Sequence, residues 1–490
     1  MSLTGSTRLR FDRGYYFSEH IELDSFSNED FIIGALEKEN NPNGVLIGKI
    51  AEFNGDMGKN LWLDIDGAHV VYIIGKRRGG KSYTLGNIAE GLSNSQVQKG
   101  TVNQAVLILD TLNIFWTMEH PVLADKKSGK DPKSELQTWG LSPEAAKNLV
   151  CYYPKGLKQE YYPQNYREFA IRTGNLDSND WSALFEVDVI SDPIGQLVSD
   201  LYDRVALEGY SKEGVKVKPN PNYDITDFLE CLRYDEEIQR FDSRTIEAVR
   251  RRINAVKRFS FFSQIGTDLR EVFNPGQITV LLLRDLDPQL RGLVIGNIVK
   301  TMVKMRGVSC ECEKRAQMKC READTHQEID ASKSAQLRRD AEVLQSQAKS
   351  GLSRGWILID EAHNYVPQIG IIGSKAPLKK FVNEGRNIGL SIAVTTQQPS
   401  GLDSSIRRNA DILLIHSISM KSDIDVAESM LNTAVPSDFE LDKKIVHDNV
   451  FERMVRGLQT GYAIVSCANS NRIFLAKMRP RVSAHGGTDF

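Results

Sequence analysis

Short, almost continuously apolar runs recur along the chain and predict the strands of a sheet. They lie at 105–110, 277–283, 355–360, 390–396 and 411–416. Strands that are buried on both faces have this pattern, which is typical of a parallel sheet covered by helices. Stretches with apolar residues at helical spacing lie between the runs. We therefore expect an α/β fold with a mainly parallel sheet.

The first 68 residues contain shorter apolar runs separated by turn residues. Runs at 31–36, 45–50 and 61–65 are separated by segments that contain Asn, Gly, Pro and Asp. Several short strands at regular spacing are typical of a small β-structure. We therefore expect a β-barrel-like domain, or a small open sheet, at 1–68.

The alternation of strand and helix patterns is interrupted twice. Residues 119–272 have apolar positions at helical spacing, for example in 192–209 and 245–259, and predict a mainly helical insertion. Residues 309–350 are polar and charged and predict an exposed helical excursion. The remaining predicted parts are a first and a second part of the α/β core and a C-terminal tail, at 69–118, 273–478 and 479–490.

The charge balance limits how nucleic acid could be bound. The 490 residues include 62 Lys and Arg and 64 Asp and Glu, which gives a net charge of −2 at pH 7. A nucleic-acid-binding surface would therefore be a local patch rather than a general excess of positive charge. One basic stretch, 250–252 with Lys257 and Arg258 close behind, is either a solvated helix face or such a patch.

Cysteine content and hydropathy indicate a cytoplasmic protein without a membrane partner. The six cysteines are too few for a secreted disulfide framework. The N-terminus lacks the apolar segment of a signal peptide, and no apolar run approaches the roughly 20 residues that span a bilayer. The spacing of Cys310, Cys312, Cys320 and His326 matches none of the common zinc patterns, so we expect no metal there.

The strongest chemical signal follows the apolar run 70–74. The sequence Gly75-Lys76-Arg77-Arg78-Gly79-Gly80-Lys81-Ser82 satisfies the pattern G-x-x-x-x-G-K-[ST]. Glycines let backbone N–H groups point at phosphate oxygens, and the N-terminus of a following helix adds partial positive charge. Lys81 can then reach the β- and γ-phosphates, and Ser82 can bind Mg²⁺. We predict an ATP and Mg²⁺ site with nucleotide contacts from Gly75, Gly79, Gly80, Lys81, Ser82 and Tyr83.

A second signal is the apolar run 356–359, which is followed by Asp360 and Glu361. Carboxylates at the C-terminal end of a buried strand lie where open α/β sheets bind ligands. Asp360 would hold Mg²⁺, and Glu361 would orient and deprotonate the water that attacks the γ-phosphate. An apolar run that ends in Asp-Glu is common, but beside a P-loop it indicates hydrolysis as well as binding.

A third signal surrounds the run 390–396. Gln397 follows it and could contact the γ-phosphate and the attacking water; the alternative is a simple turn set by Pro399 and Gly401. Arg386 precedes the run. In a ring, an arginine there could stabilise transition-state charge at a neighbouring subunit's nucleotide; alone, it would be a surface or salt-bridge residue.

Taken together, these segments resemble the HerA branch of the HerA/FtsK superfamily of P-loop ATPases. The Asp-Glu-Ala-His-Asn-Tyr-Val-Pro block and the succession from Glu-Gly-Arg to Gln-Gln-Pro-Ser are its more specific parts. The resemblance runs from about residue 45 to the C-terminus. The matching segments are Gly75–Ser82, Ile357–Pro367, Glu384–Gly389, Thr396–Ser400 and Arg479–Gly487.

The resemblance implies a RecA-like motor with an N-terminal β-barrel and a helical insertion, assembled as a homo-hexamer around double-stranded DNA. It implies that Lys81 and Ser82 hold phosphate and Mg²⁺ and that Asp360 and Glu361 are the acidic pair. Gln397 would be the sensor and Arg386 the trans-acting arginine. Relatives act beside a nuclease in DNA end processing, or in antiphage defence with a nuclease or a sirtuin-like effector. We expect such a partner here.

Two segments depart from the family pattern: the cationic Lys76-Arg77-Arg78 within the P-loop and the stretch 111–116 after Asp110. They indicate a divergent member and tilt the expectation toward defence. The first function is an ATP-driven DNA translocase or helicase. The alternative is a nucleotide-gated hexameric scaffold that activates an effector enzyme without translocation. A third, a DNA-pumping ATPase of conjugation or chromosome segregation, is disfavoured by the lack of a membrane segment.

Overall fold

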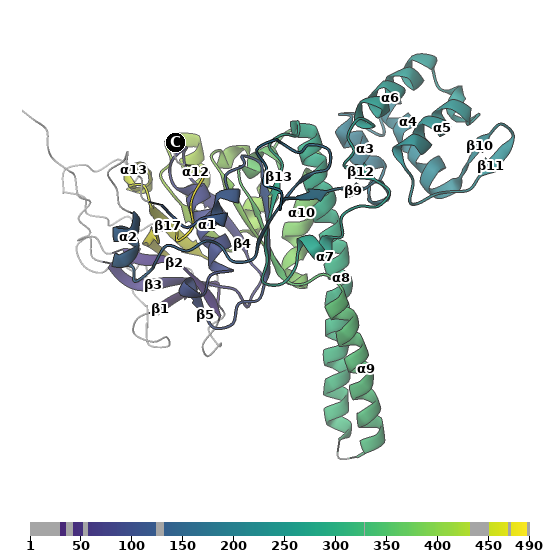
Figure 1. Cartoon of the computed structure of the whole chain (residues 1–490). Helices are drawn as coiled ribbons and strands as arrows, with labels where there is room; N and C mark the ends of the chain where they lie inside the picture. The colour runs from purple at the N-terminus through teal and green to yellow at the C-terminus, as the bar shows by residue number, and fades with distance from the viewer. Residues whose placement is uncertain are drawn as a thin grey trace, which may run out of the picture.

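One large mixed sheet organises the protein (Figure 1). The structure is a computed structural model that describes residues 30–35, 43–51, 57–123, 132–327, 329–431, 450–468 and 472–487. Within these residues the sheet has 14 strands, in the order β1-β3-β2-β18-β17-β16-β4-β15-β14-β6-β13-β7-β8, with β5 paired to β2.

The centre of the sheet is parallel, as the sequence predicts. The eight strands from β16 to β8 pair in parallel, so their carboxyl ends meet at one edge. They are β16 (Ile412–Ile415), β4 (Val70–Ile74), β15 (Leu390–Thr396), β14 (Gly355–Ile359), β6 (Ala105–Asp110), β13 (Ile278–Leu282), β7 (Leu149–Pro154) and β8 (Arg167–Phe169).

Helices cover both faces of this parallel region, which explains why its strands are almost continuously apolar. In β4, Val71 and Ile73 pack on the face that carries α1 (Lys81–Gly91), whereas Tyr72 and Ile74 face the core that includes α8 (Pro288–His326) and α10 (Lys375–Glu384). The two sets alternate because successive side chains of a strand point to opposite faces.

The N-terminal strands extend this sheet. β1 (Asp30–Ile33), β2 (Gly44–Ala51) and β3 (Met57–Asp64) reach the parallel region through β18 (Arg472–Met478) and β17 (Tyr462–Cys467). β2 pairs with β3 on one side and with β18 and β5 (Gln98–Lys99) on the other, β18 at Gly48–Ile50 and β5 at Gly44–Val45. In the described residues these strands therefore continue an open sheet and do not close into a separate barrel. The rest of the predicted barrel, at 1–29, 36–42 and 52–56, lies outside the described residues.

The helical insertion is present, but its predicted range also contains sheet strands. β7 and β8 belong to the central sheet because β7 pairs with β13 along four residues. The lobe that follows contains α3 (Ser178–Leu184), α4 (Pro193–Tyr202), η5 (Asp203–Glu208), α5 (Ile225–Tyr234), α6 (Ser243–Val256) and the short strands β9 (Ile171–Arg172), β10 (Tyr210–Lys212), β11 (Val215–Val217) and β12 (Phe262–Ser263). Its core is aromatic, with Trp181, Tyr223 and Phe228 in contact.

A long helical hairpin projects downward in Figure 1, away from this lobe. Asp287 caps α8 by accepting bonds from the amides of Gln289 and Leu290, and Pro288 starts the helix. The first half of α8 packs on the sheet. Its second half and α9 (Ala331–Ser350) form an antiparallel pair, in the range where the sequence predicts an exposed helical excursion.

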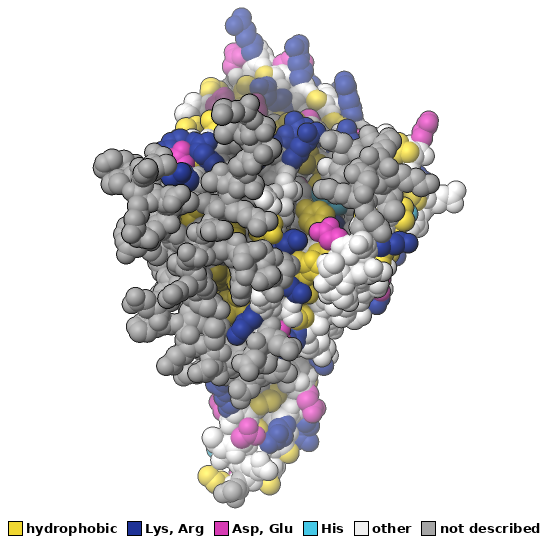
Figure 2. Space-filling model, turned by 90° about the vertical axis from the view of Figure 1, so that its left-hand side faces the viewer, with side chains coloured by type: hydrophobic (Ala, Val, Ile, Leu, Met, Phe, Trp, Pro, Cys, Tyr) yellow, Lys and Arg dark blue, Asp and Glu magenta, His cyan; other side chains and the backbone are white. Residues whose placement is uncertain are grey.

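The remaining elements connect these parts. They are α2 (Pro132–Thr138), α7 (Leu269–Val272), α11 (Ser404–Asn409), α12 (Lys421–Ser429), α13 (Val450–Gly457) and the 3₁₀ turns η2 (Ser95–Val97), η3 (Trp116–Glu119), η4 (Thr173–Asn175), η6 (Ile238–Arg240), η7 (Ala362–Asn364), η8 (Gly385–Ile388) and η9 (Pro399–Gly401). Where described residues are visible in Figure 2, Lys and Arg side chains lie beside hydrophobic and polar ones. In the described residues, no helix combines the length and apolarity needed to cross a membrane.

Candidate nucleotide-binding site

The P-loop connects the carboxyl end of β4 to α1. The amide of Gly75 donates to the carbonyl of Thr396 (3.3 Å), and that of Lys76 to the carbonyl of Ser417 (2.7 Å). A Cβ on Gly75 would lie 2.7 Å from the Cβ of His416, so no larger residue fits there. Gly80 has φ 105° and starts α1 without a side-chain cap in the described structure, which leaves first-turn amides for an anion.

Lys81 is buried beside the predicted catalytic carboxylate. Its Nζ donates to the carbonyl of Lys76 (3.1 Å) and lies 3.9 Å from Glu361 Oε1. Burial lowers the pKa of Lys81, although the charges of Glu361 and Asp360 act in the opposite direction. A buried ammonium with a single hydrogen bond among the described residues is well suited to bind an anionic ligand such as phosphate.

Asp360 lies directly after β14 and has one unsatisfied oxygen. Its Oδ1 accepts from the Glu361 amide (3.0 Å) and from the hydroxyl of Thr395. Its Oδ2 is buried and has no hydrogen-bond partner in the described residues. A buried carboxylate oxygen of this kind fits a divalent cation or a water bound to one, so the residues present fit Mg²⁺.

Asp110 ends the neighbouring strand β6 and is a site residue that the sequence did not single out. Leu109 of β6 and Ile359 of β14 are register partners. Asp110 and Asp360, which directly follow them, are therefore at matching positions at the ends of the two strands. Burial raises the pKa of Asp110 to about 6, and the charge of Asp360 acts in the same direction. Both of its oxygens accept backbone amides, from Leu112 (3.1 Å) and Phe115 (2.8 Å), so Asp110 shapes the loop after β6.

Glu361 is held in an uncommon backbone conformation, with φ 52°. A non-glycine residue with positive φ is strained, and such strain concentrates at functional sites. Its carboxylate accepts bonds from the backbone amide of Gln397 (3.3 Å) and from the side-chain amide of the same residue. The structure therefore brings Gln397 to Glu361.

Two histidines that the sequence analysis gave no role complete the site. His363 Nδ1 lies 3.0 Å from Thr396 Oγ1 and 3.4 Å from Glu361 Oε2. His416 follows β16 and contacts Thr84 Oγ1 (3.0 Å) through Nε2. Burial lowers the pKa of His416 to about 4, so this imidazole is neutral beneath the P-loop. His363 could have been found by its place after the Asp-Glu pair, whereas no local signal marks His416.

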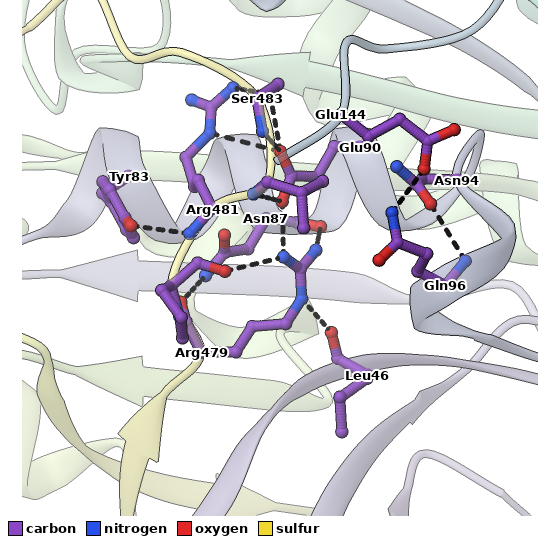
Figure 3. Close-up of polar contacts among 12 residues, drawn as sticks. Leu46, Tyr83, Asn87, Glu90, Asn94, Gln96, Glu144, Arg479, Arg481 and Ser483 are labelled. Atoms are coloured by element: carbon purple, nitrogen blue, oxygen red, sulfur yellow. Dashed lines mark hydrogen bonds and ion pairs between the residues drawn. The ribbon is translucent and has the colours of Figure 1, made fainter. Parts of the chain in front are cut away.

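Ser82 lies in the first turn of α1 and is partly buried. Tyr83 points elsewhere: its hydroxyl accepts a bond from the backbone amide of Arg481 (2.6 Å) (Figure 3). Its ring packs edge-on against that of His485, with ring centroids 5.5 Å apart. Tyr83 thus contacts the C-terminal tail.

The tail is attached to α1 through Glu90, which is fully buried (Figure 3). Arg479 pairs with Glu90 and donates to the carbonyls of Asn87 (2.8 Å) and Leu46 (2.6 Å). The hydroxyl of Ser483 donates to the other Glu90 oxygen (2.6 Å). Burial opposes ionisation of Glu90, but the two arginines, Arg479 and then Arg481, outweigh it and lower its pKa.

Arg386 is not part of this site within one chain. It lies in η8, before β15, and therefore at the amino ends of the parallel strands, whereas Lys81 and Glu361 lie at the carboxyl ends. Its side chain is 44% exposed, and its Nη2 is 3.8 Å from Asp411 Oδ2. A role at a nucleotide would require the site of a neighbouring copy.

Asp411 also belongs to a closed cluster at the amino edge. His69 lies between Asp411 Oδ2, 2.7 Å from Nδ1, and Asp64 Oδ2, 2.9 Å from Nε2. Burial opposes the charge on His69, but the two carboxylates outweigh it and raise its pKa to about 9. In the described residues, no group of three or more His, Cys, Asp or Glu side chains is placed to hold a metal by itself.

Comparison with known proteins identifies the fold. No protein-family model and no curated protein matches the chain. VirB4 of Thermoanaerobacter pseudethanolicus aligns with TM-score 0.50 and 12% identity over 90% of this chain and 97% of that chain. Plasmid coupling protein TrwB, in complex with the ATP analogue ADPNP, gives TM-score 0.47 and 13% identity over 94% and 98%. The genome packaging NTPase B204 of Sulfolobus turreted icosahedral virus 2 gives 0.31 and 10% over 84% and 97%.

The likeness to VirB4 extends over nearly the whole of both chains, and at this identity it shows the fold. The chain has the P-loop ATPase fold of VirB4, with a mainly parallel sheet whose carboxyl edge carries the P-loop. The predicted α/β fold class is thereby confirmed.

Proposed function

We propose that the protein hydrolyses ATP with Mg²⁺ and uses the energy to move double-stranded DNA. One observation carries the first part of this proposal. Lys81 Nζ lies 3.9 Å from Glu361, at the edge where α/β sheets bind ligands. Beside it is Asp360, whose buried Oδ2 has no hydrogen-bond partner among the described residues. A cation, a candidate metal ligand and a candidate base thus converge next to a free helix N-terminus.

Each residue has a separate task in this proposal. Lys81 and the first-turn amides of α1 bind the phosphates. Ser82 and Asp360 hold Mg²⁺, which supplies neutralising charge for the phosphate oxygens when bound. Glu361 accepts the proton of the attacking water. Gln397 holds the Glu361 carboxylate and reports on the γ-phosphate. His363, whose pKa is lowered by burial, contacts Glu361 as a neutral imidazole at pH 7.

The assembly part of the proposal is a ring of copies, a homo-hexamer in the families that the sequence resembles. In such a ring Arg386 would act in trans, because an arginine at the amino edge can reach phosphate only on another copy. DNA is the proposed substrate on the strength of the sequence resemblance, and a nuclease or sirtuin-like partner remains a prediction from the same source.

The test is ATP hydrolysis by Glu361→Gln protein, with and without duplex DNA, after the mass of the assembly with ATP has been measured. We expect the rate to fall by about 10²- to 10⁴-fold, because the base is lost. Glu384→Gln is the matched control, since Glu384 is exposed and pairs only with Lys380, at 3.8 Å, among the described residues.

Different outcomes separate the parts of the proposal. Full activity in Glu361→Gln would contradict the assigned chemistry. A wild-type rate that duplex DNA leaves unchanged would contradict the motor function and favour a nucleotide-gated scaffold. A monomer under all conditions would remove any role of Arg386 in trans.

A further inference from the structure

Helix α6 in the insertion lobe has one apolar face and one cationic face. Ile246, Val249, Ile253 and Val256 are buried and pack into the lobe. From Ser243 to Arg258 the chain has six basic residues and one acidic residue. The helical spacing of these buried residues explains why α6 forms, but it does not explain why the exposed face is cationic.

The rest of the lobe has the opposite charge. Outside 243–258, residues 173–272 include 18 acidic and seven basic residues. The positive charge is therefore concentrated on α6, and it is not used to neutralise the acidic remainder. Among the described residues, the only carboxylate that pairs with an α6 cation is Glu247, which binds Arg250 (2.8 Å) and Arg251 (3.2 Å).

Four exposed cations form what we call the α6 stripe: Arg244, Arg251, Lys257 and Arg258. The Arg251 side chain is 79% exposed. Arg244, Lys257 and Arg258 have no carboxylate within ion-pair distance in the described part of the chain. Arg244 and Arg251 are seven residues apart, about 10.5 Å along one side of a helix. The stripe can therefore contact several charges of an extended anion.

The chemistry of the stripe favours nucleic acid over an acidic protein. Protein interfaces have apolar or aromatic centres and few charged residues there. In the described structure, no large hydrophobic side chain is exposed between 243 and 258. Surfaces that bind nucleic acid are polar and positive, and arginine matches phosphate bidentately. Five of the six basic residues of this segment are arginine.

We propose that the α6 stripe binds the phosphate backbone of nucleic acid without reading its sequence. This inference rests on the proposed function and adds to it a second contact, in the lobe that extends away from the sheet (Figure 1). Because α6 is remote from Lys81 and Glu361, backbone binding at the stripe is separable from the chemistry of hydrolysis.

The test uses the full chain in which Arg244, Arg251 and Arg258 are each changed to Gln. The matched control changes Lys212 and Lys216 of the β10–β11 hairpin, and Lys218 directly after it, to Gln, which removes the same charge from the same lobe. Affinity for duplex DNA and for single-stranded DNA is measured across a salt series, with poly-glutamate as a competitor. Basal ATP hydrolysis and thermal unfolding of each variant check that the motor and the fold are intact.

We expect the stripe variant to bind at least one of the two DNA forms about tenfold more weakly near 0.1 M salt, because three phosphate contacts are lost. The slope of log affinity against log salt should fall by about 1 for each arginine that contacts a phosphate. The control variant should keep the wild-type slope, and substitution of the three arginines by Lys should keep most of the affinity. Basal ATP hydrolysis should not change.

Three results would overturn the inference, and they can be told apart. Equal affinity and slope in the stripe and control variants would remove the stripe contact and leave the DNA motor intact. Competition by poly-glutamate as strong as that by DNA would assign the stripe to an acidic protein. Absence of wild-type binding to either DNA form would remove the proposed function as well.

Discussion

The two ends of α1 each carry a buried charged side chain, and they differ in how completely it is paired. At the start, Lys81 has one hydrogen bond and faces Asp360, one of whose oxygens has no partner in the described structure. Near the other end, both oxygens of Glu90 accept hydrogen bonds from the tail. An open polar cluster can accept a ligand, whereas a closed one can only hold the fold together.

The contrast is sharpened by helix electrostatics. A carboxylate near a helix C-terminus is unfavourable because the macrodipole is negative there. Glu90 nevertheless occupies the last turn of α1, where the Arg479 and Arg481 guanidinium groups offset both the dipole and the cost of burial. At the opposite end the macrodipole favours an incoming anion. One helix is thus anchored at its C-terminal end while its N-terminal end stays available.

The largest expected effect on stability comes from removing the charge of Glu90, at the C-terminal end of α1. Glu90→Gln leaves Arg479 and Arg481 buried without a counter-charge, so the free energy of unfolding should fall by about 3–5 kcal/mol. Chemical denaturation at pH 7 measures this change. The exposed Glu384 provides the comparison, since Glu384→Gln should alter stability by less than about 0.5 kcal/mol.

At a temperature where Glu90→Gln is still folded, ATP hydrolysis per folded molecule should be close to that of the wild type. A variant that is fully stable but inactive would show that the tail acts on the site, and the distinction between the two ends of α1 would then be lost.

The cluster of His69, Asp411 and Asp64 provides a second test of whether a fully paired buried charge stabilises the fold. The pKa of His69 rises from 6.5 to about 9 on folding, between Asp411 and Asp64. The charged His69 therefore stabilises the fold fully below pH 6.5, and this contribution is lost as the pH rises through about 9. At about 1.4 kcal/mol for each tenfold change in proton affinity, it amounts to about 3 kcal/mol at most.

Unfolding free energies at pH 6.5, 7.5 and 9 measure this loss. His69→Gln should be less stable at pH 6.5 and should have a flatter profile across the same range. Stability that increases between pH 6.5 and 9 in the wild type would mean that His69 is neutral in the folded protein and that the cluster is not an ion pair.

The sequence was most informative where function depends on neighbouring residues. The P-loop lies within eight residues, and the Asp-Glu pair directly follows its strand, so the pattern and its structural context coincide. Apolar runs without alternation correctly predicted a parallel sheet because both of its faces are covered. Gln397 could also be placed, since it follows a strand that pairs with the Asp-Glu strand.

Contacts between distant segments could not be predicted in this way. Glu90 meets Arg479 across 389 positions, and His416 reaches Thr84 across 332. Nothing local marks either pair. The N-terminal strands have the pattern of a small β-structure, but only the pairing of β2 with β18 determines that they extend the main sheet. The position of Arg386 was deducible, because a residue before a parallel strand lies at the amino edge.

The smallest expected effect concerns Tyr83, which the sequence assigns to the nucleotide and the structure places against the tail. Tyr83→Phe removes the acceptor of the Arg481 amide and keeps the ring beside His485. Because one buried amide then lacks a partner, the free energy of unfolding should fall by about 1–2 kcal/mol. Nucleotide affinity, measured by titration of a fluorescent ATP analogue, should stay the same, and Ser82→Ala, which removes a proposed Mg²⁺ ligand, is the contrasting variant. If Tyr83→Phe left stability unchanged and reduced nucleotide affinity, Tyr83 would be a nucleotide contact, as the sequence predicts. The C-terminal tail would then belong to the ligand-binding end of α1.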